Sequence, residues 1–155
     1  MSKLPDPKMD GIDHIRIDLY AASRLGCKLP LLADVKVSHP VHGKFRTGQG
    51  LWVYLKIGKK KAEELRMAEG FEAKEIGADF SNLWVKTLKD DIKIAMRSKI
   101  EDNIEIFVPF LESTLPFRYY HISRKKVIEP KETKWIGEWL SELREEFKAI
   151  AAKVK

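Results

Sequence analysis

Apolar residues recur at intervals of three and four positions through the C-terminal part of this 155-residue chain. Pro130 precedes them and suits the first turn of a helix. The apolar positions that follow are Trp135, Ile136, Trp139, Leu140, Leu143, Phe147 and Ile150. This spacing places them on one face of an α-helix. The sequence therefore predicts a long closing helix that packs one side against the rest of the protein.

The same helical spacing recurs through the middle of the chain. Helices are expected over residues 45–57, 60–68, 71–76, 80–102 and 103–113. Gly48 and Gly50 weaken the start of the first of these helices, and Gly58 is a suitable end for it. Pro109 interrupts the last one because proline has no backbone donor.

The expected helix over 80–102 has one apolar and one basic side. The apolar side carries Trp84, Leu88, Ile92, Met96 and Lys99, and the basic side carries Lys86, Lys89, Lys93 and Arg97. Together with the basic runs at 59–61 and 124–126, this stripe would follow a nucleic-acid backbone. The alternative is that these side chains simply face solvent, as most charged helix faces do.

Three segments have strand character. Residues 12–20 alternate, with Ile15 and Ile17 on one face and His14 and Arg16 on the other. A second short strand is expected over 33–38, and a hairpin or extended loop over 115–128. The expected fold is therefore mainly α with minor β. A chain of this length fits one domain, with residues 1–11 as a flexible N-terminus and 12–155 as the domain.

The charge balance favours an anionic partner. Lysine and arginine number 29 against 23 aspartate and glutamate, a net charge of +6, which attracts nucleic acid, phosphates or acidic proteins or serves solubility alone. The single cysteine, Cys27, cannot form an internal disulfide, so a cytoplasmic setting is expected. There is no apolar run long enough for a membrane helix or a leader, and no membrane association is expected.

Several common chemistries lack their motifs in this sequence. There is no Walker loop and no Gly-x-Gly-x-x-Gly segment. His39 and His42 lie three apart, but no cysteine or carboxylate follows at metal-ligand spacing. Cys27 has no partner at the spacing of a catalytic motif. The sequence predicts neither a metal site nor a bound cofactor.

An ordered set of short segments carries a resemblance to a known family. In chain order, the segments are Leu25-Gly26, His39-Pro40-x-x-Gly43-x-Phe45, Gly50-Leu51-Trp52, Leu65-Arg66, Gly70-Phe71-x-Ala73-Lys74-x-x-Gly77, Trp84, Ala95, Lys99, Asn103, Leu115-Pro116-Phe117, Lys126-Val127 and Lys134-Trp135. Over about residues 12–145 the chain resembles the NADAR (YbiA-like) family, in its phage-type branch. The resemblance implies a compact, mostly helical fold and hydrolysis of N-glycosidic bonds to ribose, in ribosyl-amine or ADP-ribosyl substrates.

Two departures from the family pattern bear on activity. Gln49 stands where the family has its catalytic Glu, and residues 29–32 (Leu-Pro-Leu-Leu) replace a segment whose Asn helps to form the pocket. A carboxylate stabilises the oxocarbenium character of the ribose and accepts a proton from water, whereas an amide has neither charge nor basicity. If another carboxylate replaces the missing Glu, the candidates are Asp79, Asp91 and Glu101.

The expected site combines Gln49 with two tryptophans and three basic residues. Trp52 and Trp84 would wall a nucleobase, or they are core residues. Arg66, Lys74 and Lys99 would hold phosphates, or they extend to solvent. The first hypothesis is a protein that binds an ADP-ribose-like nucleotide with weak or no hydrolysis. The alternatives are an active N-glycosyl hydrolase on a ribosylated base or nucleic acid, and a repurposed phage module that binds a host protein.

Overall fold

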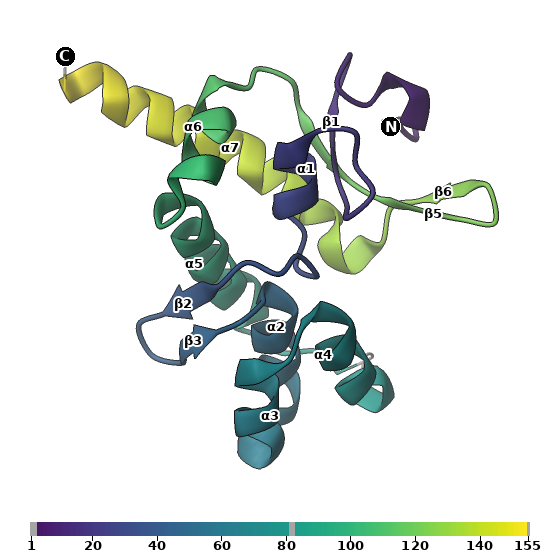
Figure 1. The fold of residues 1–155 in the computed structure, drawn as a ribbon, viewed down its shortest axis with the longest axis vertical. Coiled ribbons are helices and arrows are strands. Elements are labelled where there is room, and N and C mark those ends of the chain that lie inside the picture. Colours follow the sequence, from purple (N-terminus) through teal and green to yellow (C-terminus); the bar gives the residue numbers. More distant parts are fainter. Residues whose placement is uncertain (1–2, 81–82, 155) are drawn as a thin grey trace. The chain divides into compact units, whose positions relative to one another are not determined.

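The computed structural model describes residues 3–80 and 83–154. These residues form two compact units. The central unit comprises residues 31–106, and the terminal unit comprises residues 1–30 and 107–155. Helices dominate both units and each short sheet has two strands, so the expected mainly α fold with minor β is confirmed (Figure 1). Among the helices that the structure describes, none combines the length and the apolar character needed to cross a bilayer.

The central unit combines a small hairpin with five helices. The strands β2 (Val37–His39) and β3 (Gly43–Phe45) are antiparallel, with Val37 opposite Phe45. The helices are α2 (Gly48–Ile57), α3 (Ala62–Met67), α4 (Gly70–Ile76), α5 (Leu88–Glu101) and the start of α6 (Ile104–Glu112), with 3-10 turns η2 (Gly58–Lys61) and η3 (Ala78–Phe80). The helix α2 packs against α3, α4 and α5, and β2 packs against α5 (Figure 1).

Local signals in the sequence explain how the helices of this unit begin and end. Thr47 caps α2 by accepting a hydrogen bond from the Gly50 amide at 3.1 Å, a contact typical of threonine at this position. Gly58 ends α2 with φ of +74°, which favours glycine. Glu69 and Glu72 form a reciprocal capping box at the start of α4.

The central helix is shorter than the sequence predicted. It begins at Leu88 rather than at residue 80, so Trp84 lies before it, in a segment without helix. Asp90 and Asp91 occupy the first turn of α5, where negative charge is favoured by the unpaired backbone amides. This acidic turn, rather than the apolar spacing upstream, marks the start of the helix.

The terminal unit packs a long helix against a parallel strand pair. Its elements are η1 (Pro7–Met9), β1 (Ile15–Ile17), α1 (Arg24–Lys28), the end of α6, β4 (Phe117–Tyr119), β5 (His121–Ser123), β6 (Lys126–Ile128) and α7 (Lys131–Val154). The predicted closing helix is confirmed as α7, which packs against β4. Ile15 pairs with Phe117 and Ile17 with Tyr119. The expected hairpin near the C-terminal side of 115–128 is β5–β6.

The strand expected over residues 12–20 is shorter in the structure, at Ile15–Ile17. His14 and Arg16 are buried, like the isoleucines between which they alternate. The reason is that both faces of β1 are covered and its polar side chains have partners. His14 Nε2 lies 2.7 Å from the Tyr120 hydroxyl, and the Arg16 guanidinium lies 5.1 Å from the centroid of the same ring. The second expected strand also shifts, from residues 33–38 to Val37–His39.

Residues 3–11 lie within the described part of the chain and make specific contacts. Asp6 caps η1 through the Lys8 amide. The carboxylate of Asp10 accepts hydrogen bonds from the Arg16 and Ala22 amides at 2.9 and 2.7 Å. The division into a flexible segment over 1–11 and a domain over 12–155 stays a prediction.

Candidate functional site

A groove of about 640 Å³ opens on the surface of the central unit. Its lining residues come from β3, α3 and the segments that flank β2 and β3: Asp34, Lys36, Lys44, Phe45, Arg46, Glu63, Arg66 and Met67. This volume lies within the range of roughly 300–1,000 Å³ that is usual for small-molecule sites. Four of its eight lining side chains are basic and two are acidic, so the groove suits an anion.

Arg66 is the best-positioned cation of the groove. Its guanidinium carbon lies 4.6 Å from the centroid of the Phe45 ring and 5.5 Å from that of Tyr54. Its Nη1 donates a hydrogen bond to the Lys44 carbonyl at 3.1 Å. Stacking and this bond hold the planar guanidinium in one orientation, while arginine has five N–H donors in all. Arg66 can therefore present the rest of its donor fork to an anion at little entropic cost.

Arg46, in contrast, is neutralised within the wall of the groove. It forms a bidentate pair with Asp34, with Nε–Oδ1 at 2.9 Å and Nη2–Oδ2 at 3.0 Å. The hydrogen bond and the charge of Asp34 raise the pKa of Arg46. Lys36 and Lys44 have no ion pair within residues 3–80 and 83–154. With Arg46 and Asp34 paired to each other, the groove offers a ligand the positive charges of Lys36, Lys44 and Arg66 against the single negative charge of Glu63.

A second polar cluster in this unit was not predicted from the sequence. Asp91, from α5, lies 2.8 Å from His39 Nε2 and 3.7 Å from His42 Nε2. The sequence reading found no carboxylate near these histidines because Asp91 is about fifty positions away in the chain. The sequence signal that could have drawn attention to Asp91 is its place beside Asp90, in the acidic first turn of α5. The rings of His39 and His42 lie 4.6 Å apart.

The hydrogen bonds of His39 define its tautomer and argue against a metal at this cluster. Its Nδ1 accepts from the amides of Val41 and His42, at 3.0 and 3.3 Å. A neutral ring must then carry its proton on Nε2, which donates to Asp91. A metal bound at Nε2 would need an unprotonated Nε2, and the Nδ1 of a metal-bound histidine normally carries the proton and donates a hydrogen bond. The three side chains are close enough to hold an ion, but the geometry favours a hydrogen-bonded link between β2 and α5.

Aromatic contacts connect the histidine cluster to the groove. The His42 ring packs edge-on against Tyr54, with centroids 5.6 Å apart. Tyr54 in turn lies 5.2 Å from Phe45, and Arg66 covers both of these rings. The groove and the cluster therefore lie on two sides of one aromatic pair within the central unit.

Gln49 and Trp52 lie on a different face of α2 from Tyr54. Gln49 occupies the first turn and is half-buried. Its backbone amide donates a hydrogen bond to the Leu31 carbonyl at 2.8 Å. Trp52 is buried, with 6% of its surface exposed, and Lys56 lies 5.2 Å from its ring centroid. These three residues share one helix face by their spacing. Neither Gln49 nor Trp52 lines the groove.

The remaining predicted site residues are spread over the unit. Lys74 is exposed on α4, and Trp84 is exposed over 81% of its surface before α5. Lys99 is fully buried in α5, so it does not extend to solvent. Of the six residues predicted for the site, only Arg66 lines the groove. The role of the other five stays a prediction.

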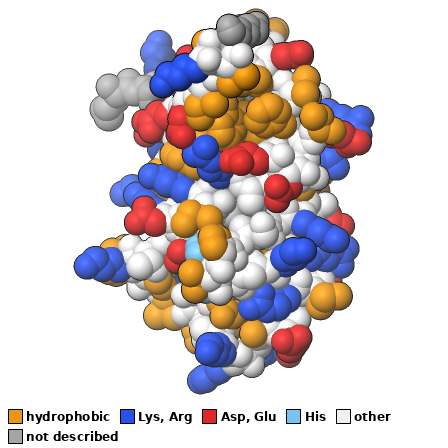
Figure 2. Space-filling model, turned by 90° about the vertical axis from the view of Figure 1, so that its left-hand side faces the viewer, with side chains coloured by type: hydrophobic (Ala, Val, Ile, Leu, Met, Phe, Trp, Pro, Cys, Tyr) orange, Lys and Arg blue, Asp and Glu red, His pale blue; other side chains and the backbone are white. Residues whose placement is uncertain are grey.

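The predicted basic stripe is divided in the structure. Lys86 lies before α5, and Arg97 pairs with Glu101 at 2.5 Å on the surface of the helix. Figure 2 shows acidic side chains (red) next to several of the lysine and arginine side chains (blue) on the face drawn.

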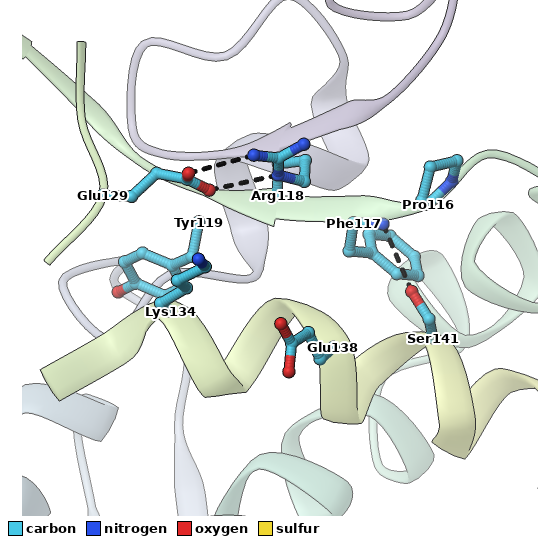
Figure 3. A pocket seen from close by; sticks show the side chains of 8 residues that line it. All are labelled: Pro116, Phe117, Arg118, Tyr119, Glu129, Lys134, Glu138 and Ser141. Carbon is cyan, nitrogen blue, oxygen red and sulfur yellow. Dashed lines mark hydrogen bonds and ion pairs between the residues drawn. The ribbon is translucent and has the colours of Figure 1, made fainter. Parts of the chain in front are cut away.

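The terminal unit has a smaller pocket of about 350 Å³ between β4 and α7. Figure 3 shows Arg118 and Glu129 facing each other along one wall, joined by two bonds of 3.0 and 2.9 Å. Glu138 and Ser141 lie on α7 across the pocket, and Ser141 accepts a bond from the Phe117 amide. Arg118 also donates to the Lys3 carbonyl. The charges of Arg118 and Glu129 are thus satisfied by each other, and the remaining charged lining residues, Lys134 and Glu138, are opposite in sign. The central groove, with its excess of positive charge, is the better candidate site.

Comparison with solved structures identifies the fold. The NMR structure of the E. coli protein YbiA matches with a TM-score of 0.67, over 90% of this chain and 88% of that chain, at 19% sequence identity. No protein-family model and no curated protein sequence matches. At this identity the likeness shows the fold alone. The chain has the YbiA-like (NADAR) fold that the sequence predicted, while the phage-type branch stays a prediction.

Proposed function

We propose that the central unit binds a ribosyl nucleotide of the ADP-ribose class in the Arg66 groove. The observation that supports this most is the stacked, half-buried guanidinium of Arg66 beside two lysines without ion pairs. Phosphate oxygens match an arginine fork and lysine point charges. Met67, which is exposed, supplies apolar surface for a base or ribose.

We further propose that hydrolysis of the N-glycosidic bond is weak or absent. By the sequence resemblance, Gln49 stands where the NADAR family carries its catalytic Glu. Gln49 does not line the Arg66 groove, so this second proposal rests on the resemblance and is separate from the binding proposal. An amide keeps the shape and the hydrogen bonds of a carboxylate, but it cannot stabilise a positive ribose or accept a proton from water. Loss of a general base typically lowers a rate by about 10²–10⁴-fold.

Thermal-shift titration with ADP-ribose, NAD and GMP tests the binding proposal. A ligand at about a hundred times its Kd should stabilise the protein by about 2.7 kcal/mol. Arg66→Met should abolish the shift. Lys60→Met removes an equal charge from the exposed η2 turn of the same unit, and it should leave the shift unchanged. Loss of the shift in both variants, or no shift in the wild type, would contradict the groove as the site.

A second candidate function is an active N-glycosyl hydrolase that uses Asp91. Of the three carboxylates that the sequence offered as replacements, Asp79 is exposed and Glu101 pairs with Arg97. Asp91 is the one held in a partly buried cluster, beside His39 and His42. Under this alternative, wild-type protein releases base from an ADP-ribosylated guanine nucleoside, and Asp91→Asn abolishes release. Wild-type inactivity would exclude it.

A further inference from the structure

We infer that the β5–β6 hairpin of the terminal unit is a contact surface for the phosphate backbone of duplex nucleic acid. The inference rests on three features of the hairpin: its strained turn, its unpaired charge and its exposure. It is independent of the groove of the central unit, so each proposal can fail without the other.

The turn of this hairpin has a backbone conformation that is unfavourable for the residue types that occupy it. Arg124 and Lys125 form the two-residue loop between Ser123 and Lys126, with φ of +49° and +64°. Positive φ at both central positions defines a type I′ turn, for which Asn-Gly is the favoured sequence. Side chains as long as arginine and lysine are unfavourable there. Such strain at an exposed position is a reason to look for a function of the side chains.

The basic side chains of the turn have no acidic partner in the described chain. Arg124, Lys125 and Lys126 are consecutive and exposed. None of them forms an ion pair within residues 3–80 and 83–154, and residues 121–128 contain no aspartate or glutamate. The tip therefore carries three positive charges that nothing in the described protein balances.

The hairpin also contributes little to the core of its unit. Every residue of β5 is exposed, and Val127 alone is half-buried in β6. Figure 1 shows the hairpin extending from the end of β4 with its turn pointing away from the helices of this unit. A two-stranded hairpin without packing is only marginally stable by itself, so the fold does not explain why this one is present.

The composition of the hairpin distinguishes among polyanions. Lysine, arginine and serine are the usual phosphate-contacting side chains, and a two-stranded ribbon fits the major groove of a duplex. Single-strand binding uses aromatic side chains that stack on bases, and residues 121–128 contain no phenylalanine, tyrosine or tryptophan. A membrane-binding tip would carry apolar anchors, whereas Ser123 to Lys126 are all polar. Duplex backbone is the best match.

The experiment is fluorescence anisotropy of a labelled, mixed-sequence DNA duplex over a salt series. The key variant is Arg124→Asn with Lys125→Gly, which removes two charges and installs the favoured turn. The logarithmic salt slope should fall in magnitude by about two, since each phosphate contact contributes roughly 0.9. The thermal midpoint of the variant should stay equal or rise, which rules out unfolding as the cause of weaker binding.

A matched control variant makes the result decisive. Lys131→Gln with Lys153→Gln removes the same charge from exposed positions of α7 in the same unit, and its slope should match the wild type. Equal loss in both double variants would show only general attraction and would overturn the inference. So would absence of duplex binding at low salt, or binding to phosphatidylserine vesicles or to the single strand in preference to the duplex.

Discussion

His39 Nε2 and Asp91 Oδ1 lie 2.8 Å apart and join β2 to the first turn of α5. The histidine is almost fully buried and the carboxylate is largely so. Asp91→Ala leaves the Nε2 proton of His39 without an acceptor in a buried position. Unfolding in urea should show a loss of about 1–3 kcal/mol. Asp91→Asn should lose less, because its amide oxygen still accepts the bond.

Asp90→Ala is the matched control for this link. Asp90 lies beside Asp91 in the same acidic turn but is exposed. Its replacement tests the interaction with the helix N-terminus alone, which is worth about 0.3–1 kcal/mol. Equal destabilisation by the two alanine variants would show that the bond to His39 adds nothing.

Gly137 in α7 should resist replacement by alanine. A Cβ built at this position lies 2.7 Å from the carbonyl oxygen of Phe117 and 3.3 Å from the amide nitrogen of Tyr119, both of them backbone atoms of β4. Helix propensity alone would favour alanine by roughly 0.5–1 kcal/mol. The contact should reverse that sign and destabilise the protein by about 1–3 kcal/mol, measured by urea unfolding. Glu142→Ala, on the exposed side of α7, should be nearly neutral. A stabilised Gly137→Ala would mean that α7 does not approach β4 this closely.

Tyr120 should make stability fall at alkaline pH. Burial raises the pKa of its hydroxyl to about 12, whereas an unfolded tyrosine ionises near pH 10. Between these values the unfolded chain releases the proton and the folded chain keeps it. Stability is therefore fully present below pH 10 and declines as the pH rises toward 12. Urea midpoints from pH 9 to pH 12 measure the decline.

Tyr120→Phe isolates this effect. It keeps the buried ring but removes the group that titrates, so the decline should be shallower than in the wild type. The remaining tyrosines are present in both proteins and cancel in the comparison. The variant should also lose stability at neutral pH, because His14 loses its 2.7 Å partner. Parallel curves for the two proteins would contradict a buried, neutral Tyr120.

The sequence predicted the helices better than the strands, for physical reasons. Apolar spacing identified α7 and α6, and Gly58 correctly marked the end of α2, because periodicity and caps are local. The strands have three residues each, too few for alternation to be read. The start of α5 was wrong because the apolar spacing extended through Trp84, while the acidic first turn that begins the helix was overlooked.

The candidate site was harder to predict because its contacts are not local. Arg66 was singled out by the family resemblance, but its stacking on Phe45 depends on the packing of α3 against β3. The link between His39 and Asp91 joins residues far apart in the chain. Lys74, Trp84 and Lys99 were chosen at motif positions. The place of Lys99 on the apolar side of its helix indicated burial, whereas the exposure of Lys74 and Trp84 had no such signal.

Gln49→Glu tests the chemical meaning of one of the two departures of this chain from the family it resembles. Position 49 is in the first turn of α2, where a carboxylate is compatible with the helix dipole and should stabilise the helix by about 0.3–1 kcal/mol. If the family chemistry applies here, the variant should release base from an ADP-ribosylated guanine nucleoside about 10²–10⁴-fold faster than the wild type. Chromatography of the products measures the rate. Gln49→Ala should show no gain, since it opens space without supplying a base. A folded Gln49→Glu protein that binds ADP-ribose but is no faster than the wild type would show that a missing carboxylate at this position does not limit the reaction.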